Sequence, residues 1–403
     1  MLRLTPLVHF YVSLIIVGCT TTSEPIKDTN QTSSDAPEMV AGYPRTMGES
    51  DSIDSSSSIQ TQDPLAWSPW SAGPYQVGVQ RFEWTYEPEA WGSSRTIMIY
   101  IWYPTEEVEG PYIRYLDLFP DLDVIENATP AQSSYTAGSP VLAHSHGWEG
   151  FAGNSAFLMR HFASHGWIVI APDHRGNTPF DQLDPFPSAF DYIRSFDIRE
   201  TINVLSNQPL LSDHGLDTLD INSDKVILSG HSYGGYTAWA AAGVTYNMPR
   251  QREECPQCSV DQLAIFDSGL RDSRVAGIIP MAGPLSDTQI ADDDSVSVSI
   301  PVFMMSGSDD NPEIYQRHFD QLHQLDYRWL ELTGGCHNSF GLPTCQTLMP
   351  ELGYELINAY ALSFGRYVLL NDDQADIVSL LNGTNQPSSF ARLQRHSTSS
   401  NKE

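Results

Sequence analysis

Apolar and polar positions alternate along most of the chain in runs that predict regular secondary structure. Longer stretches of helical character fall between the later apolar runs, at 157–165, 191–205, 233–243 and 354–370. Eight short runs rich in β-branched and aromatic residues predict strands at 77–84, 95–104, 141–144, 167–171, 226–228, 275–279, 302–305 and 327–332. Strands that alternate with helices indicate an α/β fold with a mostly parallel eight-stranded sheet and helices on both faces.

The segments between and after these runs set the expected domain limits. Residues 66–375 are predicted to form one folded domain, followed by a polar C-terminal tail at 376–403. Within the domain, 105–139 is expected to be a polar loop. Two insertions, 174–188 and 245–272, hang off strand ends, and each could roof a pocket or be a plain surface loop.

The N-terminal residues predict export. Residues 1–19 combine a short basic start with an apolar run too short to span a bilayer, which is typical of a secretory signal. The run ends at Gly18 and Cys19, a pattern that resembles the bacterial lipobox, in which the cysteine is lipidated; a conventional signal peptide is the alternative. Residues 20–65 are rich in Ser, Thr, Asp and Gln and predict a disordered tether. We therefore expect an outer-membrane or cell-surface lipoprotein held by a lipid on Cys19, or else a secreted or periplasmic protein.

Charge and cysteine content narrow the possible partners. Fifty acidic against twenty-one basic residues give a formal net charge of −29, which disfavours binding to nucleic-acid phosphates or anionic lipid headgroups. The four remaining cysteines predict two disulfides in an exported chain, preferably Cys336 with Cys345 and Cys255 with Cys258. A Cys-x-x-Cys can also be redox-active or half of a zinc site, but neither a thioredoxin-like context nor a second zinc-type pair accompanies it. We expect no metal and no cofactor.

The candidate chemistry centres on Ser232 in the sequence Gly-His-Ser-Tyr-Gly. A predicted strand before it and Ala-rich helical residues after it make this a G-x-S-x-G nucleophile elbow, a tight turn that exposes the serine hydroxyl. Glycine is needed at Gly230 and Gly234 because larger side chains would collide with the strand or the helix. An ordinary Gly/Ser turn is the alternative. An elbow further requires an oxyanion donor upstream, then an acid and a histidine downstream.

Residues for all three roles follow predicted strands in the required order. A glycine-rich turn after 141–144 predicts the backbone N–H of Trp148 as one oxyanion donor, beside that of Tyr233. The segment Gly-Ser-Asp-Asp after 302–305 supplies Asp310 as the acid, with Asp309 as the alternative, and a Gly-Gly-Cys-His loop supplies His337. Two other histidines are expected to be hydrogen-bonded framework residues: His144 and His146.

This set of residues predicts acyl transfer. His337 would take the proton of Ser232 as the hydroxyl attacks a carbonyl, while Asp310 holds the imidazole in the required tautomer. The two backbone donors would stabilise the tetrahedral intermediate, and water would then free the acid. A bridge between Cys336 and Cys345 would hold the histidine loop in place.

Several stretches carry a family resemblance: Pro-Val-Leu-Ala-His-Ser-His-Gly at 140–147, Ala-Ser-His-Gly-Trp-Ile-Val at 163–169, Gly-His-Ser-Tyr-Gly-Gly at 230–235 and His-Asn-Ser-Phe at 337–340. With the strand spacing, they make residues 72–375 resemble the α/β-hydrolase fold, in particular the secreted platelet-activating factor acetylhydrolases and the bacterial dienelactone-hydrolase-like enzymes. The resemblance implies a metal-independent serine ester hydrolase acting on small or short-chain acyl esters, with phospholipid-like esters among the candidates.

Two departures limit what the resemblance implies. Dienelactone hydrolases use cysteine where this chain has Ser232. The animal acetylhydrolases place the acid after the sixth strand, where this chain has Met281, so the acid role passes to Asp310 or Asp309. The His337 loop with its nearby cysteine is also similar to bacterial cutinase-like polyester hydrolases. An interfacial polyester or lipid hydrolase is therefore the alternative enzyme, and a non-catalytic surface binding protein on a hydrolase scaffold is the alternative of another class.

Overall fold

The computed structural model describes residues 62–290 and 296–396, which belong to the second of two units, Ala41–Glu403. The predicted signal segment 1–19, the lipidation site at Cys19 and nearly all of the tether lie outside the described residues. In the described part, no helix is both long and apolar enough to cross a membrane.

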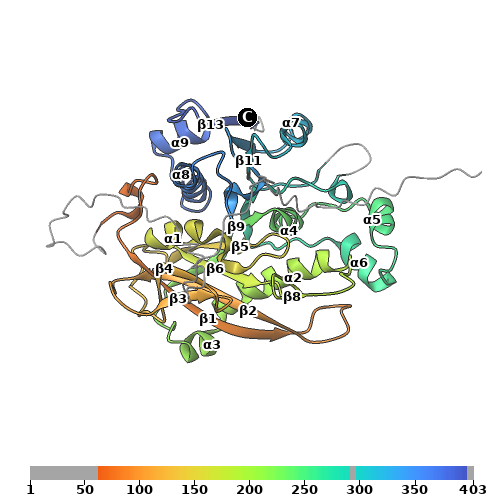
Figure 1. Cartoon of the computed structure of the whole chain (residues 1–403), viewed down its shortest axis with the longest axis horizontal. Coiled ribbons are helices and arrows are strands. Elements are labelled where there is room, and N and C mark those ends of the chain that lie inside the picture. The colour runs from red at the N-terminus through yellow and green to blue at the C-terminus, as the bar shows by residue number, and fades with distance from the viewer. Residues whose placement is uncertain (1–61, 291–295, 397–403) are drawn as a thin grey trace, which may run out of the picture. The chain divides into compact units, whose positions relative to one another are not determined.

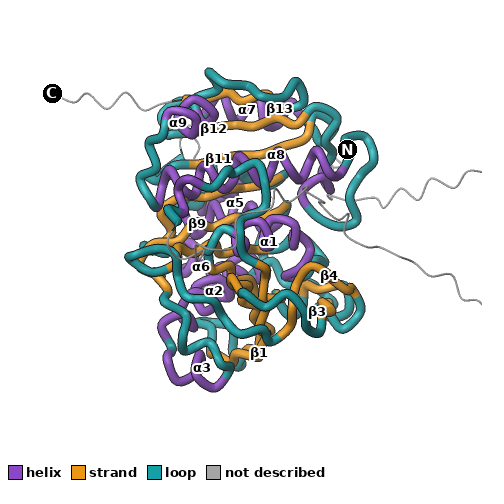
Figure 2. The backbone as a smooth tube through the Cα atoms, turned by 90° about the vertical axis from the view of Figure 1, so that its left-hand side faces the viewer, coloured by secondary structure: helices purple, strands orange, loops and turns teal. Residues whose placement is uncertain are grey.

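The domain is built on a single eleven-stranded sheet (Figure 1). Its strands, in spatial order, are β13 (Ala391–His396), β12 (Tyr327–Leu332), β11 (Val302–Gly307), β10 (Val275–Met281), β9 (Ile221–His231), β5 (Ser139–Ser145), β6 (Ile168–Asp173), β2 (Arg95–Thr105), β1 (Gln76–Tyr86), β4 (Phe119–Glu126) and β3 (Tyr112–Tyr115). The six strands from β12 to β6 run parallel. Strands β13 and β2 flank this parallel block in antiparallel orientation. Figure 2 shows β11 to β13 at one end of the sheet and β1, β3 and β4 at the other.

Helices cover both faces of the sheet. They are α1 (Ala156–Ser164), α2 (Phe190–Asn203), α3 (Gln208–Asp213), α4 (Tyr233–Ala242), α5 (Met248–Glu254), α6 (Val260–Ser268), α7 (Pro312–Gln321), α8 (Pro350–Leu369) and α9 (Ala375–Leu381). Successive side chains of β2 enter different cores, as the pleat of a strand requires. Ile99 and Ile101 pack in the core that contains α2 and α4, whereas Tyr100 and Trp102 pack in the core that contains α1 and α8.

The eight predicted strands are all present, as β1, β2, β5, β6, β9, β10, β11 and β12, and the mostly parallel α/β sheet is confirmed. The expected strand number was too low. Residues 105–139 are not only a loop, because they contain β3 and β4, which extend the sheet beyond β1. Residues 376–396 are not a tail, because they contain most of α9 and all of β13, which pairs with β12. The three missed strands of this sheet are at or next to its edges, where polar side chains are common and weaken the apolar signal.

The insertions and the cysteines are ordered. The insertion 174–188 contains a small hairpin of β7 (Asn177–Thr178) and β8 (Asp181–Gln182). The insertion 245–272 contains α5, α6 and a disulfide between Cys255 and Cys258. A second disulfide joins Cys336 to Cys345, so both pairs are those expected from the sequence.

Candidate active site

Ser232 is the single residue between the last residue of β9 and the first residue of α4. Its backbone has a positive φ of 55° with ψ of −115°, a sparsely populated conformation that costs a non-glycine residue about 1–3 kcal/mol. The surrounding chain holds this turn: the Ser232 N–H donates to the Met281 carbonyl at 2.8 Å, and the Ser232 carbonyl accepts from the Gly235 N–H at 2.8 Å. The serine hydroxyl is thereby presented at the carboxyl end of the central strand.

Two glycines of the elbow are required by close backbone contacts. A Cβ atom on Gly230 would lie 2.1 Å from the Gly234 carbonyl oxygen, and one on Gly234 would lie 1.8 Å from the Ser145 carbonyl oxygen. Both distances are far shorter than any real Cβ contact. The second contact also shows that the end of β5 is packed directly against the elbow.

A hydrogen-bonded chain of side chains leads away from Ser232. Its Oγ atom is 2.8 Å from Nε2 of His337, and Nδ1 of His337 is 3.1 and 3.2 Å from the two carboxylate oxygens of Asp310. Tyr315 donates its hydroxyl to the same carboxylate at 2.8 Å. The His337 side chain is 46% exposed and that of Asp310 only 8%. Asp309 is exposed and does not contact the imidazole, so of the two candidate acids the structure places only Asp310 beside His337.

The loops that carry the acid and the histidine follow neighbouring parallel strands and pack tightly. A Cβ atom on Gly307 would lie 2.1 Å from the Gly335 carbonyl oxygen. The histidine loop is fixed further by the disulfide from Cys336 to Cys345 and by His231, whose Nε2 lies 2.9 Å from the His337 carbonyl oxygen. Burial, and then the proximity of His337, lower the pKa of His231 to about 4. His231 is therefore neutral at pH 7 and donates this bond through Nε2–H.

A tight turn after β5 lies beside the serine. It is closed by a bond from the Gly150 N–H to the Gly147 carbonyl at 3.1 Å, with Glu149 left-handed at a φ of 52°. A Cβ atom on Gly147 would lie 3.3 Å from the Ser232 Cβ, so the turn contacts the nucleophile. Within 62–290 and 296–396, the backbone N–H groups of Trp148 and Tyr233 have no hydrogen-bond acceptor. Two backbone donors without an acceptor thus belong to the segments next to Ser232, one to the turn after β5 and the other to the first residue of α4.

The buried side chain of Arg194 holds this turn from behind. Its guanidinium donates to the Ser145 hydroxyl at 3.1 Å and to the His146 carbonyl oxygen, while its Nε donates to Thr237 in α4 at 3.2 Å. Burial lowers the pKa of Arg194 to about 10, which leaves it charged at pH 7. Arg194 therefore ties the strand that precedes the turn to the helix that follows the serine. Its role is not visible in the sequence, because an isolated arginine in a helix carries no local signal of such contacts.

A second hydrogen-bonded chain of Ser, His and Asp side chains is buried in the protein and begins at Ser145, which packs against the elbow. Ser145 Oγ is 2.9 Å from Nε2 of His174, and His174 Nδ1 is 2.8 Å from Asp197, which is paired with Arg95 at 2.7 Å. Ser145, His174 and Asp197 are fully buried, and burial lowers the pKa of His174 to about 3. This chain is framework. Two further histidines are also fully buried, in agreement with the framework expectation: His144 and His146.

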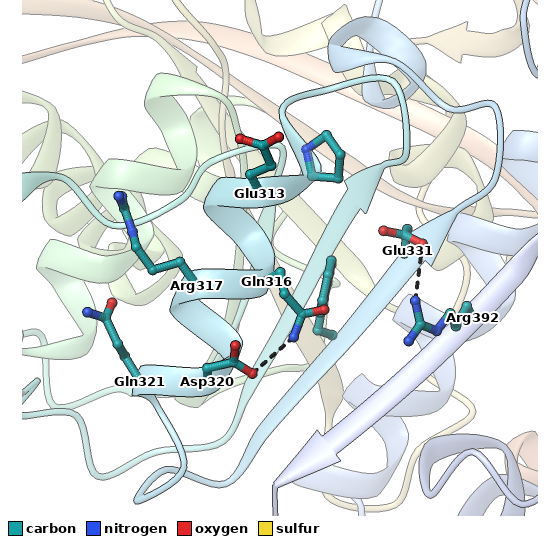
Figure 3. A pocket seen from close by; sticks show the side chains of 9 residues that line it. Glu313, Gln316, Arg317, Asp320, Gln321, Glu331 and Arg392 are labelled. Carbon is teal, nitrogen blue, oxygen red and sulfur yellow. Dashed lines mark hydrogen bonds and ion pairs between the residues drawn. The ribbon is translucent and has the colours of Figure 1, made fainter.

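A separate pocket lies on the outer side of α7, near β12 and β13 (Figure 3). Its lining is mostly charged or amide side chains. Gln316 and Asp320 are hydrogen bonded at 3.0 Å, and Glu331 lies 3.9 Å from Arg392. None of the lining residues belongs to the hydrogen-bonded set of Ser232, His337 and Asp310. Across the described residues, no three His, Cys, Asp or Glu side chains are grouped to hold a metal ion.

Comparison with known proteins places this architecture. Residues 141–383 match the model of the alpha/beta hydrolase family. The chain belongs to the α/β-hydrolase family. In this α/β-hydrolase the matched region includes Trp148, Ser232, Asp310 and His337. A solved structure of a ferulic acid esterase from Streptomyces cinnamoneus is similar in fold, with a TM-score of 0.53 and 18% identity over 82% of this chain and 99% of that chain. The search of curated proteins found no match.

Proposed function

We propose that this α/β-hydrolase is a serine carboxylic ester hydrolase acting on small or short-chain acyl esters. The observation that carries the proposal is the hydrogen-bonded chain of Ser232, His337 and Asp310 at a strained elbow, with an exposed imidazole and a buried acid. Family membership supports it, and the ferulic acid esterase of similar fold shows that such a scaffold can carry an esterase.

The proposed reaction follows from the tautomer that this geometry favours. The Asp310 carboxylate accepts a hydrogen bond from the Nδ1–H of His337, so Nε2 carries no proton. Nε2 can therefore take the hydroxyl proton as Ser232 Oγ attacks the ester carbonyl carbon. The imidazolium formed is stabilised by the buried carboxylate. It then returns its proton to the alkoxide that leaves, and an acyl-serine remains. A water molecule repeats the sequence and releases the acid.

The oxyanion of both tetrahedral intermediates would accept from the free N–H groups of Trp148 and Tyr233. These donors are fixed before substrate arrives, one by the turn after β5 and the other by the start of α4. Preorganised donors of this kind are worth about 3 kcal/mol each where one has been removed. They are backbone groups, so their contribution survives any change of the Trp148 or Tyr233 side chain that keeps the backbone in place.

Active-site labelling tests the proposal. A fluorophosphonate probe is expected to label Ser232 in the folded protein, and Ser232→Ala should abolish both labelling and hydrolysis of p-nitrophenyl acetate, by at least about 10⁴-fold in kcat. Asp310→Ala is expected to lose most activity, whereas Asp309→Ala, its matched neighbour, should keep wild-type activity. An unlabelled Ser232 together with equal rates for wild type and Ser232→Ala would exclude the proposed mechanism.

Export and lipid anchoring through Cys19 remain part of the proposal. The two disulfides support export, because such bonds persist mainly in oxidising compartments. Metabolic labelling with radioactive palmitate in a bacterial host tests the anchor. Wild type should incorporate label and partition with membranes, and Cys19→Ser should do neither; equal labelling of the two would rule Cys19 out.

A further inference from the structure

The two residues that are proposed to supply the oxyanion donors both carry aromatic side chains, and these rings lie together. The ring centroids of Trp148 and Tyr233 are 5.8 Å apart. A third ring, that of Phe186 from the insertion 174–188, meets Trp148 edge to face at 4.3 Å. Three segments far apart in the sequence thus bring three aromatic rings to the side of Ser232.

The rings are held in place from below. The Tyr233 hydroxyl donates to the Asp191 carboxylate, and the Arg194 guanidinium lies 4.4 Å from the centre of the Tyr233 ring. Phe186 packs at 4.8 Å against Phe190, which is fully buried. A ligand therefore meets a surface that needs little reordering, which lowers the entropic cost of binding.

The top of this cluster is open. Trp148 is 50% exposed, although most tryptophans in folded proteins are largely buried. Exposed aromatic surface beside a reactive group is a binding surface for apolar ligands. A ligand ring gains more here than an alkyl chain of equal size, because aromatic pairs add an edge-to-face or offset-stacked interaction to the area that they bury.

We propose that Trp148, Tyr233 and Phe186 form an aryl-binding subsite, and that the preferred substrates are neutral esters with an aromatic ring a few bonds from the scissile carbonyl. The inference rests on the proposed function and names its substrate class. Proximity to the carbonyl follows because the same two residues would supply the oxyanion donors and two of the rings. Esters that carry a negative charge are disfavoured because the whole chain has a formal charge of −29, while beside the Tyr233 ring the Asp191 carboxylate and the Arg194 guanidinium offset each other.

Matched esters test the subsite on the acyl and alcohol sides separately. Ethyl hydrocinnamate is compared with ethyl cyclohexanepropionate, and benzyl acetate with cyclohexylmethyl acetate; each pair differs only in whether the ring is aromatic. In wild type we expect kcat/KM to favour the aromatic member of at least one pair by roughly 10-fold, from one or two aromatic contacts. The pair that shows the preference identifies the side of the ester that the subsite binds.

Substitutions in the cluster then test which residues give the preference. Phe186→Leu and Trp148→Leu keep an apolar side chain but remove the ring, and each is expected to lower the aromatic-to-cyclohexyl ratio by about 2- to 10-fold. The ratio is measured within one enzyme, so a general loss of activity cancels. Phe180→Leu is the control, because Phe180 is on the same insertion, is 67% exposed and makes no ring contact among the described residues; its ratio should equal that of wild type.

The outcomes separate the two proposals. Hydrolysis of all four esters with ratios near one, or a ratio unchanged in both Phe186→Leu and Trp148→Leu, would overturn the subsite and leave the esterase intact. Failure to hydrolyse any ester, including p-nitrophenyl acetate, would overturn the proposed function and the subsite with it. Circular dichroism and urea denaturation establish whether each variant is folded. If Trp148→Leu is not folded, the ratio measured for Phe186→Leu decides the test.

Discussion

The disulfide between Cys336 and Cys345 closes the loop that carries His337, and removing it should affect stability and catalysis in separable ways. The two cysteines are nine positions apart, so the bridge closes a loop of about ten residues. For a loop of that length, the chain-entropy relation gives a loss of about 2.7 kcal/mol at 25 °C in the double variant Cys336→Ala and Cys345→Ala. The midpoint of urea denaturation is expected to fall accordingly.

Catalysis should suffer because the bridge begins next to His337. Without it, the backbone of this loop is still held by the bond from His231 to the His337 carbonyl at 2.9 Å and by the bond from the Asp309 N–H to the Gly335 carbonyl at 2.8 Å. Displacing a catalytic group by about 1 Å can cost 10²-fold in rate, so a loop that samples displaced positions part of the time is expected to lose roughly 10-fold in kcat. KM should change less, because the acyl-binding surface lies on other segments.

The second disulfide provides the matched control. Cys255→Ala with Cys258→Ala opens a loop of about four residues, for which the same relation gives about 1.9 kcal/mol. Its kcat for p-nitrophenyl acetate is expected to equal that of wild type, since this loop lies in the insertion between α5 and α6. If the Cys336 and Cys345 variant kept both its wild-type denaturation midpoint and its kcat, or if both double variants lost kcat equally, the assigned role of the His337 loop would be wrong.

Three further changes test other contacts of the site and the core. Tyr315→Phe removes the hydroxyl that donates to Asp310. The variant should remain folded while its kcat/KM for p-nitrophenyl acetate falls about 3- to 10-fold, and an unchanged kcat/KM would contradict a role for this hydrogen bond. Gly234→Ala places a Cβ 1.8 Å from the Ser145 carbonyl oxygen. The free energy of unfolding from urea denaturation should fall by roughly 1–3 kcal/mol, and fluorophosphonate labelling should be lost. A variant that is as stable as wild type and fully labelled would refute the packing argument. Burial lowers the pKa of His318 to about 4 from 6.5, so between these pH values the unfolded chain binds more protons and wild-type stability falls on acidification. In urea titrations from pH 6.5 down to 4, the free energy of unfolding of His318→Gln should therefore rise by about 1.4 kcal/mol per pH unit relative to wild type. A difference that stays constant with pH would contradict the assigned pKa.

The parts of the fold that could be predicted from sequence are those with a strong local signal. Central parallel strands are buried on both faces and read as continuous apolar runs, so all of them were found. By contrast, β13 alternates buried positions such as Ala391 and Leu393 with polar ones, and its place in the sheet depends on pairing with β12. No pattern inside residues 391–396 identifies that partner, so the polar composition of this segment by itself predicts a tail.

The candidate site divides in the same way. The elbow and the order of the acid and the histidine are local patterns, and they led to Ser232 and His337. The choice between Asp309 and Asp310 depends on which of two adjacent side chains faces the imidazole, and composition does not fix that direction. Arg194 was missed because its contacts with Ser145 and His146 bridge almost fifty positions in the sequence.

The protein contains two hydrogen-bonded sets of Ser, His and Asp side chains, one buried and one exposed, and their comparison shows how much this hydrogen-bond pattern establishes by itself. The distances are 2.9 Å from Ser145 to His174 and 2.8 Å from His174 to Asp197, close to the 2.8 Å from Ser232 to His337 and the 3.1 Å from His337 to Asp310. Geometry among the three side chains therefore does not distinguish a nucleophile from a structural hydroxyl. Three properties distinguish Ser232 from Ser145: an exposed histidine partner, a strained turn between strand and helix, and neighbouring backbone N–H groups, at Trp148 and Tyr233, that have no acceptor among the described residues. Because Ser145 also accepts from Arg194, its hydroxyl serves to fix the turn that carries one of those donors, and the buried set supports the exposed one.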